Sequence, residues 1–319
     1  LSRQVWGGTF HAVATRLLRR HAAAIGIDDG FTIVDRSDAE DLLDVVRSEL
    51  DLSRTDKRFP RKAACLAIYS HSVNAQQPLP DILSAHFPWC AEYLEDLKRL
   101  FRAYVDRKIQ ANICDYDDLL LFWQGMLTAP QIGPRIVQQF DAVLVDEYQD
   151  TNQLQASILS HLAPAGKGLT AVGDDAQSIY SFRAATVRNI LDFPEHFPES
   201  RVLRLEQNYR STMPILELTN QVIAESSQRY TKELWTTRQG GAIPQLVTCQ
   251  HEDEQADYLV TEILQQREAG IELRDQAVLF RAAQHSSVLE AELARRNVPF
   301  VKYGGLKFIE TAHTKDLMA

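Results

Sequence analysis

The apolar positions of the chain follow two different periods, one up to about residue 111 and another from residue 140 onward. In the first part they recur every three or four residues, as on one face of an amphipathic helix. Thr9 is placed as the N-cap of the first helix, and Ser37 opens a capping-box pattern before the second. Further helical faces follow at about residues 63–73 and 94–105. This part of the chain therefore predicts a helical subdomain without a strand.

From Phe140 onward, short apolar runs alternate with helical faces, after a helix that Asp115 is positioned to cap. This alternation is typical of an α/β protein with a parallel sheet. Strands are expected at residues 143–145, 169–172, 202–205, 245–248, 276–280 and 299–303. Helices are expected at residues 153–162 and 190–193, after residue 211, at residues 256–264 with Gly270 at the end, and after a capping box that Ser287 opens.

The apolar run at residues 142–145 ends abruptly in two carboxylates, Asp146 and Glu147. Such a run predicts a strand that is buried on both faces, and ligands of parallel sheets bind beyond the carboxyl ends of the strands. Asp146 could hold a Mg²⁺ ion that is bound to nucleotide phosphates, and Glu147 could orient or deprotonate an attacking water. Taken alone, the Asp-Glu pair is better explained as an acidic loop.

A second candidate site follows the run that ends at Val172. Gly173 permits a tight turn, and Asp174 and Gln177 would lie beside the first pair of carboxylates if the two strands are neighbours. A glutamine in this position can reach a γ-phosphate or the attacking water.

Aromatic and basic residues come next in the chain, at Tyr180, Phe182 and Arg183. Together they can stack on bases and hold phosphates, as in proteins that bind single-stranded nucleic acid. The alternative is a pair of core aromatics beside a surface arginine, and for Phe182 alone the two interpretations are evenly balanced.

A further candidate lies at the expected junction between two domains, near residues 206–211. Arg210 could reach across a cleft to a transferring phosphate, and Tyr209 could stack on an adenine. Taken alone, a Tyr-Arg pair ahead of a helix is more often structural.

Composition narrows the class of protein to which the chain can belong. The 319 residues predict two domains with room for a third, and the net charge of −9 means that any contacts with nucleic acid are local. No apolar run reaches the length of a membrane span, and no signal peptide opens the chain. The four cysteines lack CxxC spacing, which favours free thiols in a reducing compartment, here the cytoplasm. The chain begins without Met and ends within a helix-like pattern, so both ends are expected to be internal to a longer protein.

Seven segments occur in an order and spacing that resemble the UvrD/Rep/PcrA group of superfamily 1 DNA helicases. They are TFH, YDDLL, LVDEYQDTN, VGDDAQSIYSFR, LEQNYRS, AVLFR and YGGLKF, and they cover nearly the whole chain. The resemblance implies two RecA-like motor domains with parallel sheets, of the P-loop NTPase type, and a helical insertion. The first motor domain would comprise residues 1–11 and 112–207, the insertion residues 12–111, and the start of the second motor domain residues 208–319.

The resemblance also implies a role for each candidate residue. ATP and Mg²⁺ would be the cofactors, and single-stranded DNA and duplex junctions the partners. Asp146 would bind Mg²⁺, Glu147 would activate the water, and Gln149 would link the nucleotide site to DNA. Gln177 would sense the γ-phosphate, Tyr209 would stack on adenine, and Arg210 would act as the arginine finger. Thr9, His11, Tyr180, Phe182 and Arg183 would contact or couple to DNA, whereas Arg281 and Gly304-Gly305 belong to second-domain segments of less defined role. For His11 alone, a solvated position in the first turn is the better interpretation.

Two departures from the family pattern qualify these expectations. Ala184 stands where the family usually has Gly, and the chain contains no GxxxxGK[ST] phosphate loop. The chain is therefore expected to be the middle of a 3′-to-5′ helicase or translocase that serves DNA metabolism such as repair, with little ATP hydrolysis of its own. The alternatives are a non-catalytic nucleic-acid-binding protein with a degenerate helicase fold and the motor part of a helicase–nuclease.

Overall fold

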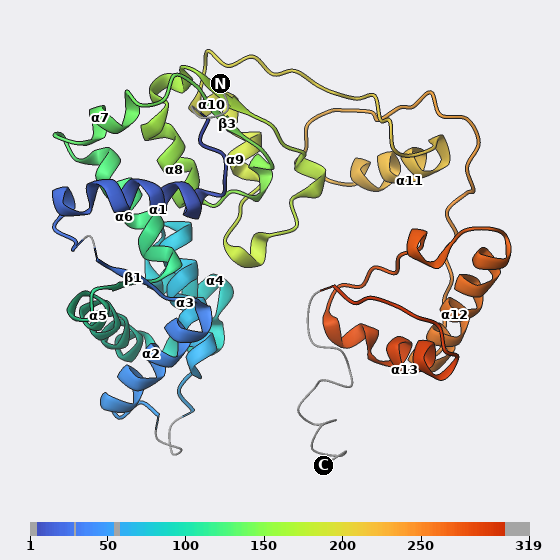
Figure 1. The fold of residues 1–319 in the computed structure, drawn as a ribbon, viewed down its shortest axis with the longest axis horizontal. Coiled ribbons are helices and arrows are strands. Elements are labelled where there is room, and N and C mark those ends of the chain that lie inside the picture. Colours follow the sequence, from blue (N-terminus) through green and yellow to red (C-terminus); the bar gives the residue numbers. More distant parts are fainter. Residues whose placement is uncertain (1–4, 29, 54–57, 304–319) are drawn as a thin grey trace. The chain divides into compact units, whose positions relative to one another are not determined.

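The computed structural model describes residues 5–28, 30–53 and 58–303, without the side chain of Arg183. The expected positions Gly304 and Gly305 lie outside the described residues. The chain divides into two compact units, Leu1–Gln239 and Gly240–Ala319, which are coloured blue to yellow and orange to red in Figure 1. The expected division of the motor domains between residues 207 and 208 is a different boundary and stays a prediction.

Helices dominate the first unit, and their starts follow the capping chemistry of the sequence. Thr9 caps the first helix, because its Oγ1 accepts a hydrogen bond from the backbone N–H of Ala12 at 3.3 Å. The second helix begins two residues earlier than expected, since Asp35 rather than Ser37 supplies the cap. The helices are α1 (Phe10–His21), α2 (Arg36–Glu49), α3 (Lys62–Ala75), α4 (Leu79–His86), α5 (Leu94–Gln110), α6 (Tyr116–Thr128), α7 (Gly133–Val137), α8 (Gln153–Leu162), α9 (Arg188–Leu191), α10 (Phe193–His196) and α11 (Met213–Ala224).

The helical part contains one short strand that the sequence did not predict. Strand β1 (Thr32–Ile33) pairs in parallel with β2 (Ile113–Cys114). At two residues each, these strands are too short to produce a period of two in the pattern of apolar residues. Their pairing places the residues just before α2 beside the residues just before α6.

The second sheet contains the two strands that matter for the candidate site. Strand β3 (Val143–Val145) and β4 (Leu169–Ala171) are parallel and in register, with Val145 opposite Ala171. Both were predicted, and their pairing confirms that the two strand ends are neighbours. The expectation of burial on both faces was wrong, because Leu144 is 79% exposed while Val145 is buried. The small apolar cluster of Val145, Tyr148 and Leu159 covers one face of the strand.

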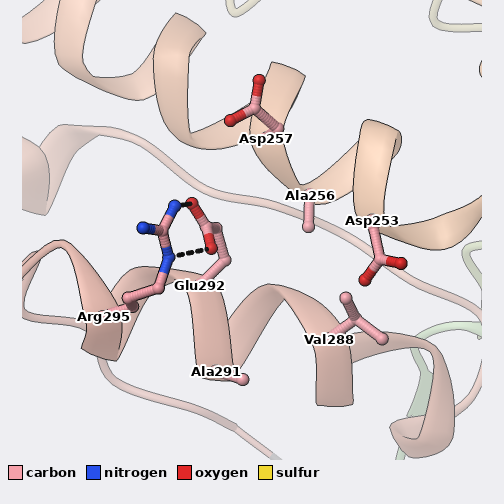
Figure 2. A pocket seen from close by; sticks show the side chains of 7 residues that line it. All are labelled: Asp253, Ala256, Asp257, Val288, Ala291, Glu292 and Arg295. Atoms are coloured by element: carbon pink, nitrogen blue, oxygen red, sulfur yellow. Dashed lines mark hydrogen bonds and ion pairs between the residues drawn. The ribbon is translucent and has the colours of Figure 1, made fainter.

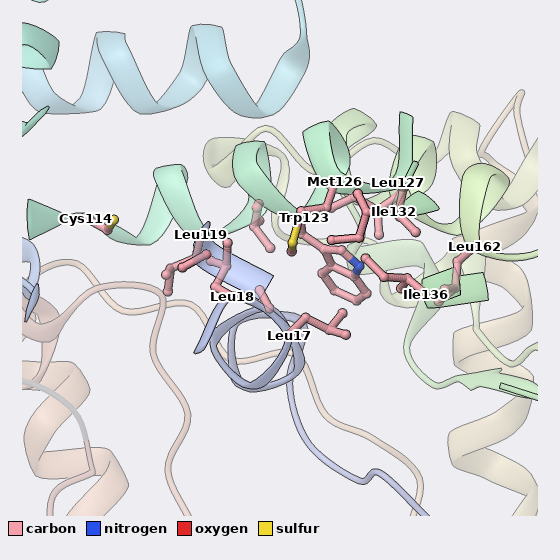
Figure 3. Packing of buried hydrophobic residues seen from close by; sticks show 14 of the residues in the cluster. Leu17, Leu18, Cys114, Leu119, Trp123, Met126, Leu127, Ile132, Ile136 and Leu162 are labelled. Carbon is pink, nitrogen blue, oxygen red and sulfur yellow. The ribbon is translucent and has the colours of Figure 1, made fainter. Parts of the chain in front are cut away.

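Two larger apolar cores hold the first unit together. Trp123 of α6 lies at the centre of one of them, which α1, α6, α7 and α8 form (Figure 3). The other lies among α2, α3, α4 and α5, with the fully buried ring of Tyr104 inside it. The α6 helix thus joins the helical part to the strands.

Four expected strands do not form. Residues 202–205, 245–248, 276–280 and 299–303 adopt no strand pairing, although all of them are described. A strand exists through hydrogen bonds with a neighbour, and these apolar runs lie in the open: Leu205 is 87% exposed, Leu246 93% and Leu279 92%. The structure therefore has α/β character with two small parallel sheets.

The second unit is built on two helices, α12 (Glu252–Glu268) and α13 (Ser287–Arg295). Gly270 follows α12 with a φ of 99°, a left-handed conformation that suits glycine at a helix end. Ser286 rather than Ser287 is the N-cap of α13, and its Oγ lies 2.6 Å from Oε1 of the buried Glu290. Short 3₁₀ turns complete both units, at Ala22–Ile25, Pro88–Tyr93, Tyr148–Asp150, Pro164–Gly166, Asp175–Gln177, Ser181–Arg183, Leu273–Asp275 and Ala283–Ser286.

Candidate functional site

The carboxyl ends of β3 and β4 meet at one edge of their sheet, and two polar segments emerge there side by side. The backbone N–H of Val172 donates to the carbonyl oxygen of Val145 at 2.8 Å, and that of Tyr148 donates to the carbonyl oxygen of Val172 at 2.9 Å. These bonds extend the ladder past the strands. They place the segment with Asp146 and Glu147 next to the segment that begins at Gly173.

Glu147 is held in position by its neighbours. Its backbone has a φ of 51°, in the left-handed region that non-glycine residues seldom adopt and that recurs at functional sites. Its N–H donates to Oδ1 of Asp146 at 3.0 Å, and its Oε2 accepts from Nε2 of Gln149 at 2.7 Å. Both Asp146 and Glu147 are exposed, so their carboxylates are open to a ligand.

Gln149 is the buried connection between the two segments. Its side chain is 1% exposed, and its Oε1 accepts from the backbone N–H of Asp174 at 2.9 Å. Gly173 makes room for this contact, because a Cβ atom there would lie 2.7 Å from Oε1 of Gln149. The amide thus joins the carboxylate of Glu147 to the start of the loop that carries Gln177.

The Gln177 side chain is engaged with Asp174, to whose Oδ2 it donates from Nε2 at 2.8 Å. Lys232 pairs with Asp174 and also with Asp175, in the latter case at 2.8 Å. Burial alone would raise the pKa of Asp174, but the hydrogen bonds from Gln177 and Lys232 hold that pKa below its usual value. Sequence reasoning missed Lys232, because a single lysine 57 residues after Asp175 leaves no local signal.

The donor set at the strand ends fits Mg²⁺. Asp146 is an exposed carboxylate at the end of β3, and its Oδ1 accepts from the N–H of Glu147. Mg²⁺ takes one or two carboxylates in nucleotide sites and keeps several waters, so a single aspartate suffices. Among the described residues, no group of three or more His, Cys, Asp and Glu side chains could form a larger metal centre.

Tyr209 and Arg210 lie in an exposed loop before α11. The Asn208 side chain shapes this loop, because its Oδ1 accepts from the backbone N–H of Arg210 at 2.9 Å and from that of Ser211 at 2.7 Å. The Tyr209 ring is 74% exposed, which leaves a face available for stacking. In the described part of the chain, no hydrogen bond or ion pair joins the Arg210 side chain to Asp146 or Glu147.

The residues expected to contact DNA fall on two separate segments. Thr9 and His11 lie at the start of α1, where Thr9 acts as the N-cap. The His11 ring packs edge-on against Tyr116 at 5.6 Å between centroids, and burial lowers the pKa of His11, so it is not the fully solvated residue of the simplest expectation.

The second segment is the turn after Gln177. The rings of Tyr180 and Phe182 lie 5.8 Å apart, and Phe182 is 71% exposed. The Arg183 side chain lies outside the described part of the structure. Ala184 has a φ of 61°, the left-handed conformation for which glycine is the usual residue.

A second polar network lies in the interior of the first unit and was not predicted. Lys108 of α5 is 2% exposed and pairs with Asp115 at 2.6 Å and with Asp118 at 2.7 Å. Burial opposes its charge, but the two carboxylates hold the pKa of Lys108 above its usual value. Tyr104 donates from its hydroxyl to Asp115 at 2.8 Å. The sequence identified Asp115 only as a helix cap, and the structure confirms that cap as a full capping box with Asp118.

A further set of buried hydrogen bonds starts at the neighbouring Asp117 and leads toward the strand ends. Asp117 Oδ1 accepts from Nδ2 of Asn74 at 2.7 Å, and Oδ1 of Asn74 accepts from Nδ2 of Asn152 at 2.8 Å. Asn189 of α9 donates to the carbonyl oxygens of Thr151 and Asn152 at 3.0 and 3.1 Å. The helical part, α6 and the segment after Gln149 are thus joined by buried hydrogen bonds.

Depressions lie beside the two helices in the described part of the second unit. One, of about 350 Å³, lies between α12 and α13, and Glu292 and Arg295 form a two-bonded ion pair at its edge (Figure 2). The other, of about 320 Å³, is lined in part by Arg281, the residue singled out in AVLFR. None of the expected catalytic residues lies in either one.

Comparison with known proteins gives two family matches that together cover nearly the whole chain. Residues 2–198 match the UvrD/REP helicase N-terminal domain, and residues 203–319 match the UvrD-like helicase C-terminal domain. No helix in the described part of the chain is long and apolar enough to cross a membrane.

Three relatives carry the same name, ATP-dependent DNA helicase PcrA. The protein of Leuconostoc citreum is 36% identical over 321 residues, which is 100% of this chain and 42% of that protein. Those of Staphylococcus epidermidis strain RP62A and Staphylococcus aureus strain COL are 34% and 33% identical over 317 residues, 99% of this chain and 42% of each relative. The chain thus spans about two fifths of the length of these curated relatives.

Proposed function

The chain belongs to the UvrD/REP helicase family, and from that premise we propose that it forms part of an ATP-dependent DNA helicase or translocase. The observation that carries the proposal is the hydrogen-bonded series Glu147–Gln149–Asp174–Gln177 across the carboxyl ends of β3 and β4. A carboxylate and an amide that are linked in this way suit the hydrolysis of a nucleotide. The relatives are named for that activity, which does not favour the non-catalytic alternative.

In the proposed mechanism, Asp146 holds Mg²⁺, which neutralises charge on the nucleotide phosphates when it is bound. Glu147 accepts the proton of the attacking water at its carboxylate, and the Gln149 amide keeps that carboxylate oriented. Gln177 leaves Asp174 to contact the γ-phosphate. Arg210 stabilises negative charge on the transferring phosphate, and Tyr209 stacks on the adenine of ATP.

The DNA contacts are proposed at the exposed turn after Gln177 and at the start of α1. Phe182, with its ring 71% exposed, would stack on a base, and Arg183 would act beside it. Tyr180, Thr9 and His11 complete the proposed surface for single-stranded DNA and duplex junctions. Movement along the strand would run from 3′ to 5′, and the protein would act in the cytoplasm.

The proposed architecture is that of RecA-like motor domains of the P-loop NTPase type. The first would comprise residues 1–11 and 112–207, with residues 12–111 as a helical insertion, and the second would begin at residue 208. The parallel pair β3–β4 and the helical character of residues 12–111 support this division.

The proposal is tested by ATP hydrolysis of the full-length protein that contains this chain, with and without single-stranded DNA. Strong stimulation by DNA is expected. DNA binding without hydrolysis in either condition would instead support the non-catalytic alternative. The 319-residue chain alone should hydrolyse little or no ATP, because it lacks a GxxxxGK[ST] phosphate loop.

The DNA surface is tested separately, by fluorescence anisotropy of the 319-residue chain with labelled single-stranded DNA. Loss of a stacking ring in Phe182→Ala should weaken binding roughly 5- to 100-fold, the usual range for one base–aromatic contact. Trp89→Ala, which removes a 66% exposed ring of the helical part, is the matched control and should leave the affinity unchanged. Equal affinities of the Phe182 variant and the wild type for DNA would show that Phe182 does not contact the DNA.

A further inference from the structure

The segment 230–238 follows α11 and contacts both loops to which the proposed function assigns a phosphate-sensing residue. At its first end, the backbone N–H of Tyr230 donates to Oδ2 of Asp175 at 3.0 Å. Lys232 pairs with Asp175 at 2.8 Å and also with Asp174. The Tyr230 hydroxyl donates to the carbonyl oxygen of Ile190 at 2.9 Å. These contacts fix this end of the segment to the Gln177 loop and to α9.

At its other end, the same segment runs beside residues 206–209. The N–H of Trp235 donates to the carbonyl oxygen of Glu206 at 3.1 Å, and the N–H of Asn208 donates to the carbonyl oxygen of Trp235 at 2.7 Å. The N–H of Glu233 donates to Oε1 of Glu206 at 3.1 Å. A guanidinium N–H of Arg238 donates to the carbonyl oxygen of Tyr209 at 3.3 Å. The backbone just before Arg210 is therefore held by this segment.

The contacts form one continuous series from Gln177 to Arg210. Gln177 donates to Asp174, Asp174 pairs with Lys232, and three residues further on the segment is bonded to the loop of Asn208. Asn208 in turn accepts from the N–H of Arg210. Among the hydrogen bonds of the described residues, no other connection between the two loops is so direct.

Lys232 is the charged element of this series. Its side chain is 16% exposed, and that of Asp175 is 3% exposed, so their pairing is largely shielded from water. Two adjacent aspartates repel each other, and Lys232 is the one basic side chain of the described residues that pairs with either of them. Loss of its charge would leave a buried carboxylate without compensation and would loosen the turn that begins at Asp174.

We propose that Lys232 is a positioning residue that ties the loop of Gln177 to the loop of Arg210 through the segment 230–238. The inference rests on the proposed function for the roles of Gln177 and Arg210, but the connection itself rests on contacts within the chain. A displacement of the Arg210 loop would then move the Gln177 loop with it, so that the two residues reach a nucleotide together.

Hydrogen exchange of the backbone amides in the 319-residue chain, without nucleotide or DNA, tests the connection. In Lys232→Met, amides at residues 174–178 and at residues 206–211 should both exchange about tenfold faster, the factor that loss of one charge-assisted hydrogen bond implies. Lys232→Arg should restore most of the protection in both loops. Unchanged protection of α8 shows that each variant is folded, and Lys232→Gln replaces the methionine variant if that one unfolds.

The matched control is Lys98→Met, which removes an exposed lysine of α5 that pairs with Glu95. It should leave both loops as in the wild type. Faster exchange at residues 174–178 alone, or at neither loop, would overturn the proposal. The exchange result does not depend on hydrolysis. If the full-length protein had no ATPase activity, the proposed function would be wrong, but the connection between the two loops would still be supported by the exchange data.

Discussion

Two polar networks of the first unit are built from the same materials, aspartates around one lysine, yet they differ in their access to water. Lys108 is 2% exposed between Asp115 and Asp118, which are 5% and 9% exposed at their side chains. Lys232 is 16% exposed and pairs with Asp175 and Asp174, which are 3% and 31% exposed at their side chains, and its network ends in the open carboxylates of Asp146 and Glu147. The difference teaches that carboxylates alone do not mark a site: the buried set supports the fold, and the strand-end set is available to a ligand.

The comparison is most severely tested by removal of each lysine. Lys108→Met leaves two carboxylates in the interior without a cation and should lower the free energy of unfolding by about 3–5 kcal/mol. Lys232→Met also leaves the buried carboxylate of Asp175 without its cation, but it should lower the free energy of unfolding by less, about 1–3 kcal/mol, because Asp174 retains contact with water and Tyr230 still donates to Asp175. Urea unfolding of the 319-residue chain measures both values. Equal losses in the two variants would mean that burial does not separate the networks.

The second test uses pH. Burial, and then the charge of Asp115, raise the pKa of Asp117 to about 6. Since this folded-state pKa lies above the value of 3.8 for an unperturbed aspartate, the native state binds the proton more tightly than the unfolded chain. The stability that this group contributes is therefore fully present below about pH 4 and is lost as the pH rises through about 6.

Asp117→Asn removes this titration while keeping an oxygen that accepts from Asn74 and Ser70. Between pH 4 and pH 7, the stability of the variant relative to the wild type should rise by about 2–3 kcal/mol. Urea unfolding at several pH values gives the difference. A difference that stays constant over this range would contradict the buried, proton-binding state of Asp117.

The smallest expected effect concerns the backbone at Ala184, which follows the exposed turn that carries Phe182. Ala184 adopts a φ of 61°, which costs a residue with a Cβ atom about 1–2 kcal/mol. Ala184→Gly relieves that strain but gives the unfolded chain more freedom, so a net stabilisation of roughly 0.5–1 kcal/mol is expected. Thermal unfolding detects it. Ala14→Gly, in the regular helix α1, is the control and should destabilise the chain.

The sequence predicted the elements whose signals are local. The cap at Thr9, the cap at Asp115 and strands β3 and β4 were all confirmed, because a capping side chain or an apolar run identifies each within a few residues. The family resemblance was confirmed as well. The roles of the individual site residues stay predictions.

What the sequence did not predict depends on partners that are distant along the chain. The pairing of Lys232 with Asp174 and the chain of amides through Asn74 and Asn152 leave no periodic signal. The expected strand at residues 202–205 failed for a related reason, since an apolar run does not say whether a neighbouring strand is present. The N-cap of α2 is Asp35 and not the expected Ser37, because both residue types cap helices and the two lie only two positions apart.

The central claim is that the strand-end network performs chemistry and the buried network does not. The most direct measurement is the rate of DNA-stimulated ATP hydrolysis by Glu147→Gln and Asp117→Asn variants of the full-length protein. We expect the Glu147 variant to lose about 10²- to 10⁴-fold in rate at unchanged stability, as when a general base is removed. The Asp117 variant should hydrolyse ATP at the wild-type rate. Wild-type hydrolysis by the Glu147 variant, or an equal loss in both variants, would contradict this account.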